Sequence, residues 1–105
     1  MFAINEGVRK IDGKDIPAFS REVISANIMK VEAGTNGYQG GDGGSGCRTY
    51  FRIQDLGSTD IHARALGLYG DEGLEVTLGG DCELSTVITA LKFITKVLED
   101  QSRRD

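Results

Sequence analysis

Residues 79–101 read GGDCELSTVITALKFITKVLEDQ, and this stretch constrains the fold more than any other. Apolar side chains recur along it at helical spacing. Asp81 follows two glycines in the position of an N-cap, whose side-chain oxygen accepts from the free N–H groups of the first turn. The pattern predicts one helix from about Cys82 to Gln101, capped by Asp81.

The apolar arc of this predicted helix is wider than one sheet requires. A helix lying on a single sheet needs an apolar arc of about 100°, whereas the apolar residues here spread over roughly 220°. The excess predicts a second partner for the helix, either the N-terminal segment or the same helix of another subunit. We expect a homodimer or higher oligomer, with Ala90, Phe93 and Val97 as interface candidates.

Upstream of the helix, short alternating runs predict strands joined by turns. Asp12-Gly13 predicts an N-terminal hairpin, because both residue types tolerate positive φ. Four further runs read as strands: residues 21–33, 47–56, 61–69 and 74–78. Short turns between them favour antiparallel pairing. We therefore expect one α+β domain over residues 1–105, with an antiparallel sheet of about five strands, the hairpin included, packed by one long C-terminal helix.

Composition excludes several classes of protein. The 105 residues carry 12 basic and 16 acidic side chains, a formal net charge of −4, which argues against a protein that coats nucleic acid by bulk charge. The sequence contains no run of apolar residues long enough to span a membrane, and no secretory signal pattern. These features predict a cytoplasmic protein.

The chain has two cysteines, Cys47 and Cys82, and one histidine, His62. A zinc site usually needs about four nitrogen or sulfur ligands, so we expect no metal. No third group is placed to orient a Cys82–His62 pair for nucleophilic catalysis. We expect no enzyme activity and no cofactor, and whether the two cysteines pair stays open.

Residues 34–46 form a glycine-rich loop, in which seven of thirteen residues are glycine. The loop contains a G-x-G-x-x-G pattern at 41–46, but it enters a strand, whereas a dinucleotide fingerprint enters a helix. Long loops are either functional or mobile connections, and both interpretations stay open. As a binding loop it offers four candidates: Asn36, Tyr38, Gln39 and Asp42.

Arg48, Tyr50 and Arg52 stand at i, i+2 and i+4, so they share one face of the predicted strand. Arg64 is placed on the same face of the neighbouring strand. Arginine beside an aromatic ring can hold a phosphate and stack on a base. The favoured alternative is a solvated face, whose arginines pair with acids such as Glu75.

A further candidate is an acidic surface built from turns: Asp55, Asp60, Asp71 and Glu72. Gathered on one side, these carboxylates would imitate a row of phosphates and occupy a basic nucleic-acid groove. Ordinary solubilising turn chemistry explains them at least as well.

Two segments, VEAGTNGYQGGDGGSGCRTYF (31–51) and LGGDCELSTVITALKF (78–93), resemble small proteins of bacteriophages and mobile elements. Size, acidity and the lack of a catalytic motif are similar to those of phage anti-defence proteins. The resemblance implies an anti-CRISPR inhibitor that binds a type II CRISPR–Cas effector nuclease or its guide complex in the host cytoplasm. A sponge protein that sequesters cyclic nucleotides or cyclic ADP-ribose is the alternative, and a structural or assembly protein of a mobile element is a third.

Overall fold

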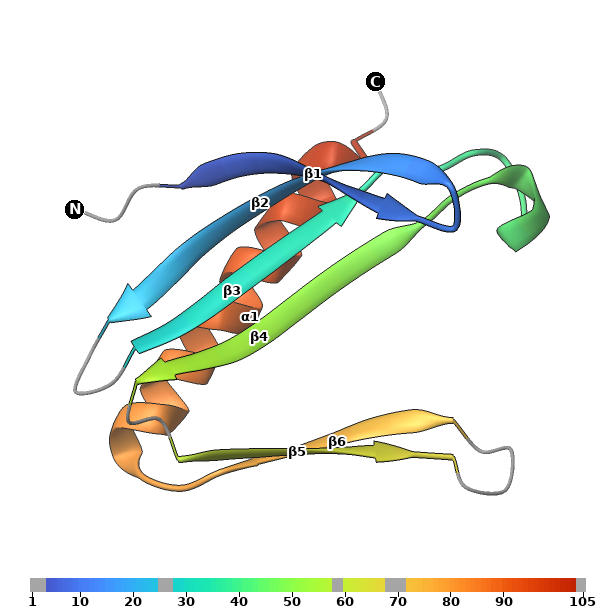
Figure 1. The fold of residues 1–105 in the computed structure, drawn as a ribbon. Helices are drawn as coiled ribbons and strands as arrows, with labels where there is room; N and C mark the ends of the chain where they lie inside the picture. Colours follow the sequence, from blue (N-terminus) through green and yellow to red (C-terminus); the bar gives the residue numbers. More distant parts are fainter. Residues whose placement is uncertain (1–3, 25–27, 58–59, 68–71, 104–105) are drawn as a thin grey trace.

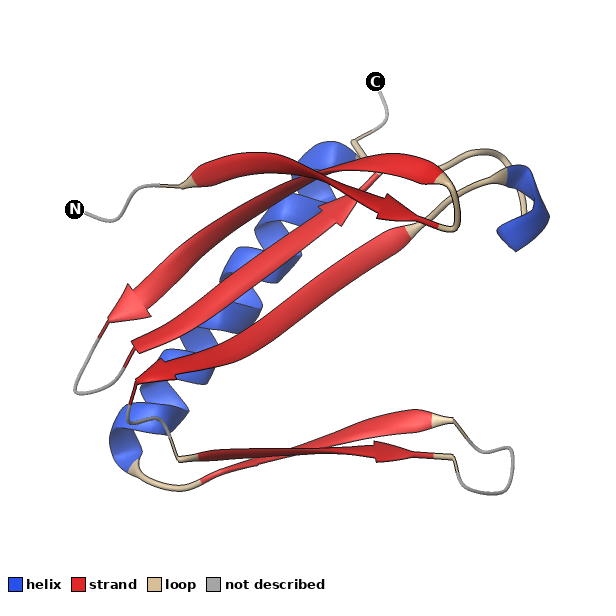
Figure 2. Cartoon of the chain, in the orientation of Figure 1, coloured by secondary structure: helices blue, strands red, loops and turns tan. Residues whose placement is uncertain are grey.

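The computed structural model describes residues 4–24, 28–57, 60–67 and 72–103 (Figure 1). The strands are β1 (Asn5–Ile11), β2 (Lys14–Ile24), β3 (Ile28–Thr35), β4 (Thr49–Gly57), β5 (Ile61–Leu66) and β6 (Gly73–Leu78). A short 3-10 turn, η1 (Gly43–Ser45), lies between β3 and β4, and the helix α1 spans Asp81–Gln101. The predicted α+β class, with antiparallel strands and one long C-terminal helix, is confirmed (Figure 2).

The strands divide into two sheets. A four-stranded antiparallel sheet has the order β1-β2-β3-β4, and β5 and β6 form a separate antiparallel pair. The base of that pair is tied to the start of α1 and not to β4. Gly79 N donates to Asp60 O at 3.0 Å, and Asp60 N donates to Glu83 Oε2 at 3.1 Å. The expected neighbour relation between residues 47–56 and 61–69 is therefore wrong.

One face of the four-stranded sheet is covered by α1 (Figure 1). The buried residues of this interface come from β2, β3 and α1: Val23, Met29, Val31, Ala33, Ala90, Ile94 and Val97. In the central strand β3 the apolar side chains of this face occur at every second position, because successive strand residues point to opposite faces. The core therefore lies between β3 and the helix.

The helix begins one residue earlier than expected. Gly80, and not Asp81, is the N-cap, and no side chain caps this end. Gly80 has φ 110°, a conformation that residues with side chains rarely adopt, and its carbonyl accepts from Leu84 N at 3.1 Å. Asp81 is therefore the first helical residue, where its negative charge still suits the positive end of the helix dipole.

The residues expected at a helix-mediated subunit interface are covered within the chain itself. Ala90 is fully buried, Val97 is 8% exposed, and Phe93 packs half-buried against the core. The outward part of the wide apolar arc carries other residues, which are Leu84, Ile88 and Leu91. Among the described residues, no helix combines the length and the apolarity that crossing a membrane requires.

Candidate functional site

Residues 36–48 connect β3 to β4 and contain most of the glycine loop. This connection is closed at its base by Asn36. Asn36 N donates to Arg48 O at 3.3 Å, and Arg48 N donates to Asn36 Oδ1 at 2.8 Å. Asn36 Nδ2 also donates to Gly46 O at 2.9 Å. These three bonds hold the two ends of the loop together.

The outer part of the loop is shaped by Asp42 and Arg48. Asp42 Oδ1 accepts from Gly44 N at 2.9 Å and so caps η1. Arg48 Nη1 donates to Gly43 O at 2.8 Å, and its Nε forms an ion pair with Asp12 Oδ2 at 2.8 Å. Arg48 thereby fastens the loop to the β1–β2 turn. These two predicted binding residues build the loop, and their polar groups already have partners inside the chain.

Tyr38 is the predicted loop residue that is presented outward. Tyr38 is 65% exposed. Gln39 is exposed too, but its Nε2 donates back to Asn36 O at 2.9 Å. Beside Tyr38 lies a small hollow of about 160 Å³, which extends toward Cys47 and Leu98. Of the four loop candidates, Tyr38 is the one that exposes a large aromatic side chain.

The inner end of the loop is fastened to α1 by Gln101, a residue that sequence reasoning missed. Thr35 N donates to Gln101 Oε1 at 2.9 Å, and Gln101 Nε2 donates to Pro17 O at 2.8 Å. One amide side chain thus joins β2, β3 and the end of α1. A glutamine at a helix end carries no sequence signal for such a role, because its partners are 66 and 84 residues away.

On the sheet face away from α1, a charged cluster surrounds Tyr50. The Arg9 guanidinium binds Glu32 in bidentate fashion, at 2.6 and 3.0 Å, and its Cζ lies 5.5 Å from the centre of the Tyr50 ring. Tyr50 Oη also donates to Glu32 Oε1, at 3.4 Å. Arg52 is exposed and lies opposite Glu32 in the β3–β4 register. The buried carboxylate of Glu32, which sequence reasoning missed, therefore balances part of the positive charge expected on this face.

The Arg9–Glu32 contact perturbs both groups. The hydrogen bond from Arg9 holds the pKa of Glu32 below its ordinary value of 4.5, although burial of the carboxyl acts in the opposite direction. The same hydrogen bond raises the pKa of Arg9. Both shifts favour the charged forms, as expected for a paired carboxylate and guanidinium.

The pH dependence of stability is expected to report this pair. A lowered carboxyl pKa in the folded state adds stability above pH 4.5, and that stability is lost as the pH falls through the folded value. Urea unfolding between about pH 3 and 7 should therefore show a smaller loss of stability in acid for Glu32→Gln than for the wild type. Glu22→Gln removes an exposed carboxylate from β2 and should keep the wild-type slope. Equal slopes for Glu32→Gln and the wild type would contradict the assignment.

Arg64 does not join this cluster. It lies on β5, where it forms an ion pair with Glu75 of β6 at 3.2 Å, the ordinary kind of pairing expected for the arginines. Because β5 pairs only with β6 in the described chain, Arg64 does not share a sheet face with Tyr50 and Arg52. Arg64 is therefore separate from Arg48, Tyr50 and Arg52, which all lie on or next to β4.

The predicted acidic residues are spread over the molecule. Asp55 lies near the end of β4, where its Oδ1 accepts from Gly57 N at 2.8 Å. Asp60 lies at the base of the β5–β6 pair and contacts His62 Nε2 at 3.1 Å. Glu72 directly precedes β6, at the opposite end of that pair, and Asp71 is outside the described residues. The described acids do not form a row.

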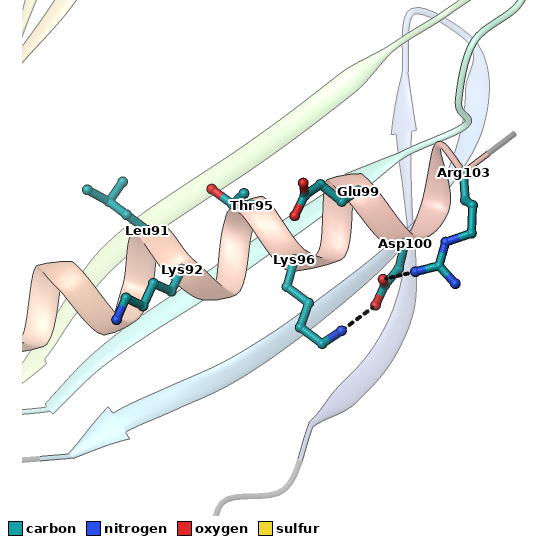
Figure 3. A pocket seen from close by; sticks show the side chains of 7 residues that line it. All are labelled: Leu91, Lys92, Thr95, Lys96, Glu99, Asp100 and Arg103. Carbon is teal, nitrogen blue, oxygen red and sulfur yellow. Dashed lines mark hydrogen bonds and ion pairs between the residues drawn. The ribbon is translucent and has the colours of Figure 1, made fainter.

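A hollow of about 650 Å³ follows the outer surface of α1 (Figure 3). All its lining side chains belong to the helix or to Arg103 just beyond it. Asp100 forms ion pairs with Lys96 and Arg103, both at 3.1 Å. Since the described lining comes from one helix and the residue that follows it, the hollow lacks the opposing walls of a ligand pocket.

The described residues contain no group of three or more histidine, cysteine or acidic side chains placed to hold a metal ion. Cys47 and Cys82 are both free thiols. No family model matches the chain, and neither a curated protein nor a solved structure does.

Proposed function

We propose that this chain is a non-enzymatic binding protein that inhibits a bacterial defence nuclease of the type II CRISPR–Cas class, and that the glycine loop contacts the nuclease. The observation that carries the proposal is the construction of the loop. Its base is closed by Asn36 and its outer part by Arg48, while Tyr38 stays 65% exposed.

A loop of this kind is suited to protein recognition. Binding residues concentrate on loops that a rigid scaffold positions, and a loop already ordered loses less entropy when it binds. Tyrosine gives a large contact area with few rotatable bonds and is enriched among the residues that dominate interface energies. Tyr38 combines these properties with exposure, so we place the centre of the contact there.

Net charge supports the class of partner. A nuclease that holds a guide and its target presents a positively charged channel, and this chain has a formal net charge of −4. Opposite charge raises the association rate and makes it fall with added salt. Because the described acids are dispersed, the steering would come from the whole chain and not from a row of carboxylates.

The proposal is tested by titrating the protein into DNA cleavage by purified type II nucleases, each with its guide. We expect inhibition that saturates near one chain, or one dimer, per nuclease and weakens as salt is raised. If the protein does not inhibit several such nucleases at about 100-fold excess, the nuclease assignment is overturned. At that excess, a complex with a Kd in the micromolar range would still be detected.

The role of the loop is tested by Tyr38→Ala in the same assay. Truncating an interface residue of this type costs about 2 kcal/mol, so the half-inhibitory concentration should rise about 30-fold. Val8→Ala is the matched control, because Val8 is 67% exposed on β1 and lies outside the loop. Equal potency of Tyr38→Ala and Val8→Ala would exclude the loop as the contact.

A further inference from the structure

The β5–β6 pair, called the arm below, has one face made only of apolar side chains. The cross-strand pairs on that face are Ile61–Leu78, Ala63–Val76 and Ala65–Leu74. Ile61 and Leu78, at the base, pack against the core. Further out, Val76 is 40% exposed and Leu74 is 61% exposed. An isolated two-stranded hairpin is marginally stable in water, so this face needs a covering partner.

The opposite face of the arm has no such need. It carries Arg64 and Glu75, which pair at 3.2 Å, and His62, which contacts Asp60. Figure 1 shows the arm leaving the body at the start of α1 as a separate ribbon. Leu66 also lies on this opposite face, at its outer end, and is 42% exposed. The base and middle of this face are therefore polar, whereas the first face is apolar along its whole length.

A second apolar surface lies on α1. Leu84, Ile88 and Leu91 recur at i, i+4 and i+7 and are 60%, 45% and 50% exposed. Phe93 stands about 200° around the helix from Leu91 and lies over Arg21 of β2, so the stripe is turned toward β4. Figure 3 shows Leu91 on that side. We call these three residues the helix stripe.

The helix stripe adjoins an unpaired sheet edge. β4 is the outermost strand of the four-stranded sheet, and Phe51, which pairs with the core residue Ala33, is 53% exposed on the face that α1 covers. An edge strand presents free N–H and C=O groups that invite pairing with another chain. Arm, helix stripe and β4 edge thus leave apolar surface and backbone groups uncovered on the β4 side.

The total surface shows how much is left uncovered. The chain exposes 7160 Å², whereas a compact protein of 11.3 kDa exposes about 5,700 Å². Its radius of gyration is 15.1 Å, against about 13 Å for a compact chain of this length. The excess of about 1,400 Å² exceeds the roughly 800 Å² that each partner buries in a standard interface, and it falls in the range of obligate dimers.

We propose that a second copy of this chain covers this surface, with the apolar face of each arm packed on the helix stripe and β4 edge of the other copy. Two-fold symmetry places the same two patches on both subunits, so one contact made twice covers all of them. The occupant has to be apolar and uncharged where it meets the stripe, and the arm has that chemistry. This dimer is independent of the contact proposed for the glycine loop.

The test is the mass in solution, measured by sedimentation velocity over about 5 to 100 µM. We expect twice 11.3 kDa for the wild type. Ile88→Glu, on the stripe, and Leu74→Ser, on the arm, should each raise the dimer Kd by about 100-fold or more, because each replaces a large exposed apolar side chain of its patch by a polar one. Both positions are exposed in the single chain, so circular dichroism should show α1 and the four-stranded sheet still folded.

Val8→Glu is the matched control. Val8 is 67% exposed on β1, at the sheet edge opposite β4, and the substitution should leave the dimer intact. A wild-type mass of one chain at 100 µM would overturn the proposal and leave the surface to a different protein. A dimer that survives both Ile88→Glu and Leu74→Ser would overturn the assignment of the surface.

Discussion

Gly34→Ala is expected to remove a large part of the protein's stability. A Cβ at position 34 would overlap the carbonyl oxygen of Pro17 and lie 2.9 Å from Ala18 Cα. Both are backbone atoms of β2, which pairs with β3 through Ala18 and Gly34 themselves. Because backbone cannot rotate away as a side chain can, β2 has to separate from β3. We expect a loss of about 3 kcal/mol or more, out of the roughly 5 to 15 kcal/mol of a typical domain.

Gly7→Ala is the matched control, since it makes the same change in the edge strand β1. A Cβ there meets no atom within 4 Å, so we expect no loss and even a small gain, about 0.5 kcal/mol, from the restricted unfolded chain. Urea unfolding followed by circular dichroism measures both. A Gly34→Ala curve that coincides with the wild type would contradict the close approach of β2 to β3.

Local signals in the sequence were sufficient for the class of fold. The Asp12-Gly13 turn is present as expected, with φ of 51° and 78°, because that pair tolerates positive φ wherever it occurs. The helix was predictable from its periodicity to within one residue at its start. The division into two sheets was not, because alternation in residues 61–66 is the same whether that strand pairs with β4 or leaves the body.

The role of Gly34 could not be predicted from local sequence either. In the sequence it is the first of many glycines in the loop, and nothing separates it from Gly40 or Gly43. In the structure it lies within β3, one residue before the strand ends, and the reason for glycine is the approach of Pro17 and Ala18. A requirement imposed by another strand cannot be read from a glycine's own neighbours.

The sequence indicated the region of the candidate site, but not what each residue does in it. Among the predicted binding residues, Asn36, Asp42 and Arg48 bind polar partners within this chain. A guanidinium that can hold a phosphate can equally hold a backbone carbonyl and an aspartate. The residue type determines which groups a side chain can bind, whereas the fold determines whether those groups lie within the same chain. That Tyr38 is an aromatic side chain exposed in the folded chain is seen only in the structure.

Gln101→Ala is expected to cost about 2 to 3 kcal/mol, more than an ordinary surface truncation. The substitution leaves Thr35 N–H, in a residue that is 5% exposed, without its acceptor and Pro17 O without its donor. A buried polar group left unpaired costs about 1 to 3 kcal/mol. The end of α1 would also be released from β2 and β3, at the point where the glycine loop begins.

The measurement combines urea unfolding with hydrogen exchange at the Thr35 amide. We expect a lower free energy of unfolding and faster exchange at Thr35, since exchange reports local opening that global unfolding does not. Glu99→Ala, an exposed residue of the same helical turn, should stay within about 0.5 kcal/mol of the wild type. Gln101→Glu keeps an acceptor for Thr35 N but sets a carboxylate against Pro17 O, so it should protect Thr35 while still lowering stability. If Gln101→Ala unfolds like Glu99→Ala, the amide does not join the three elements.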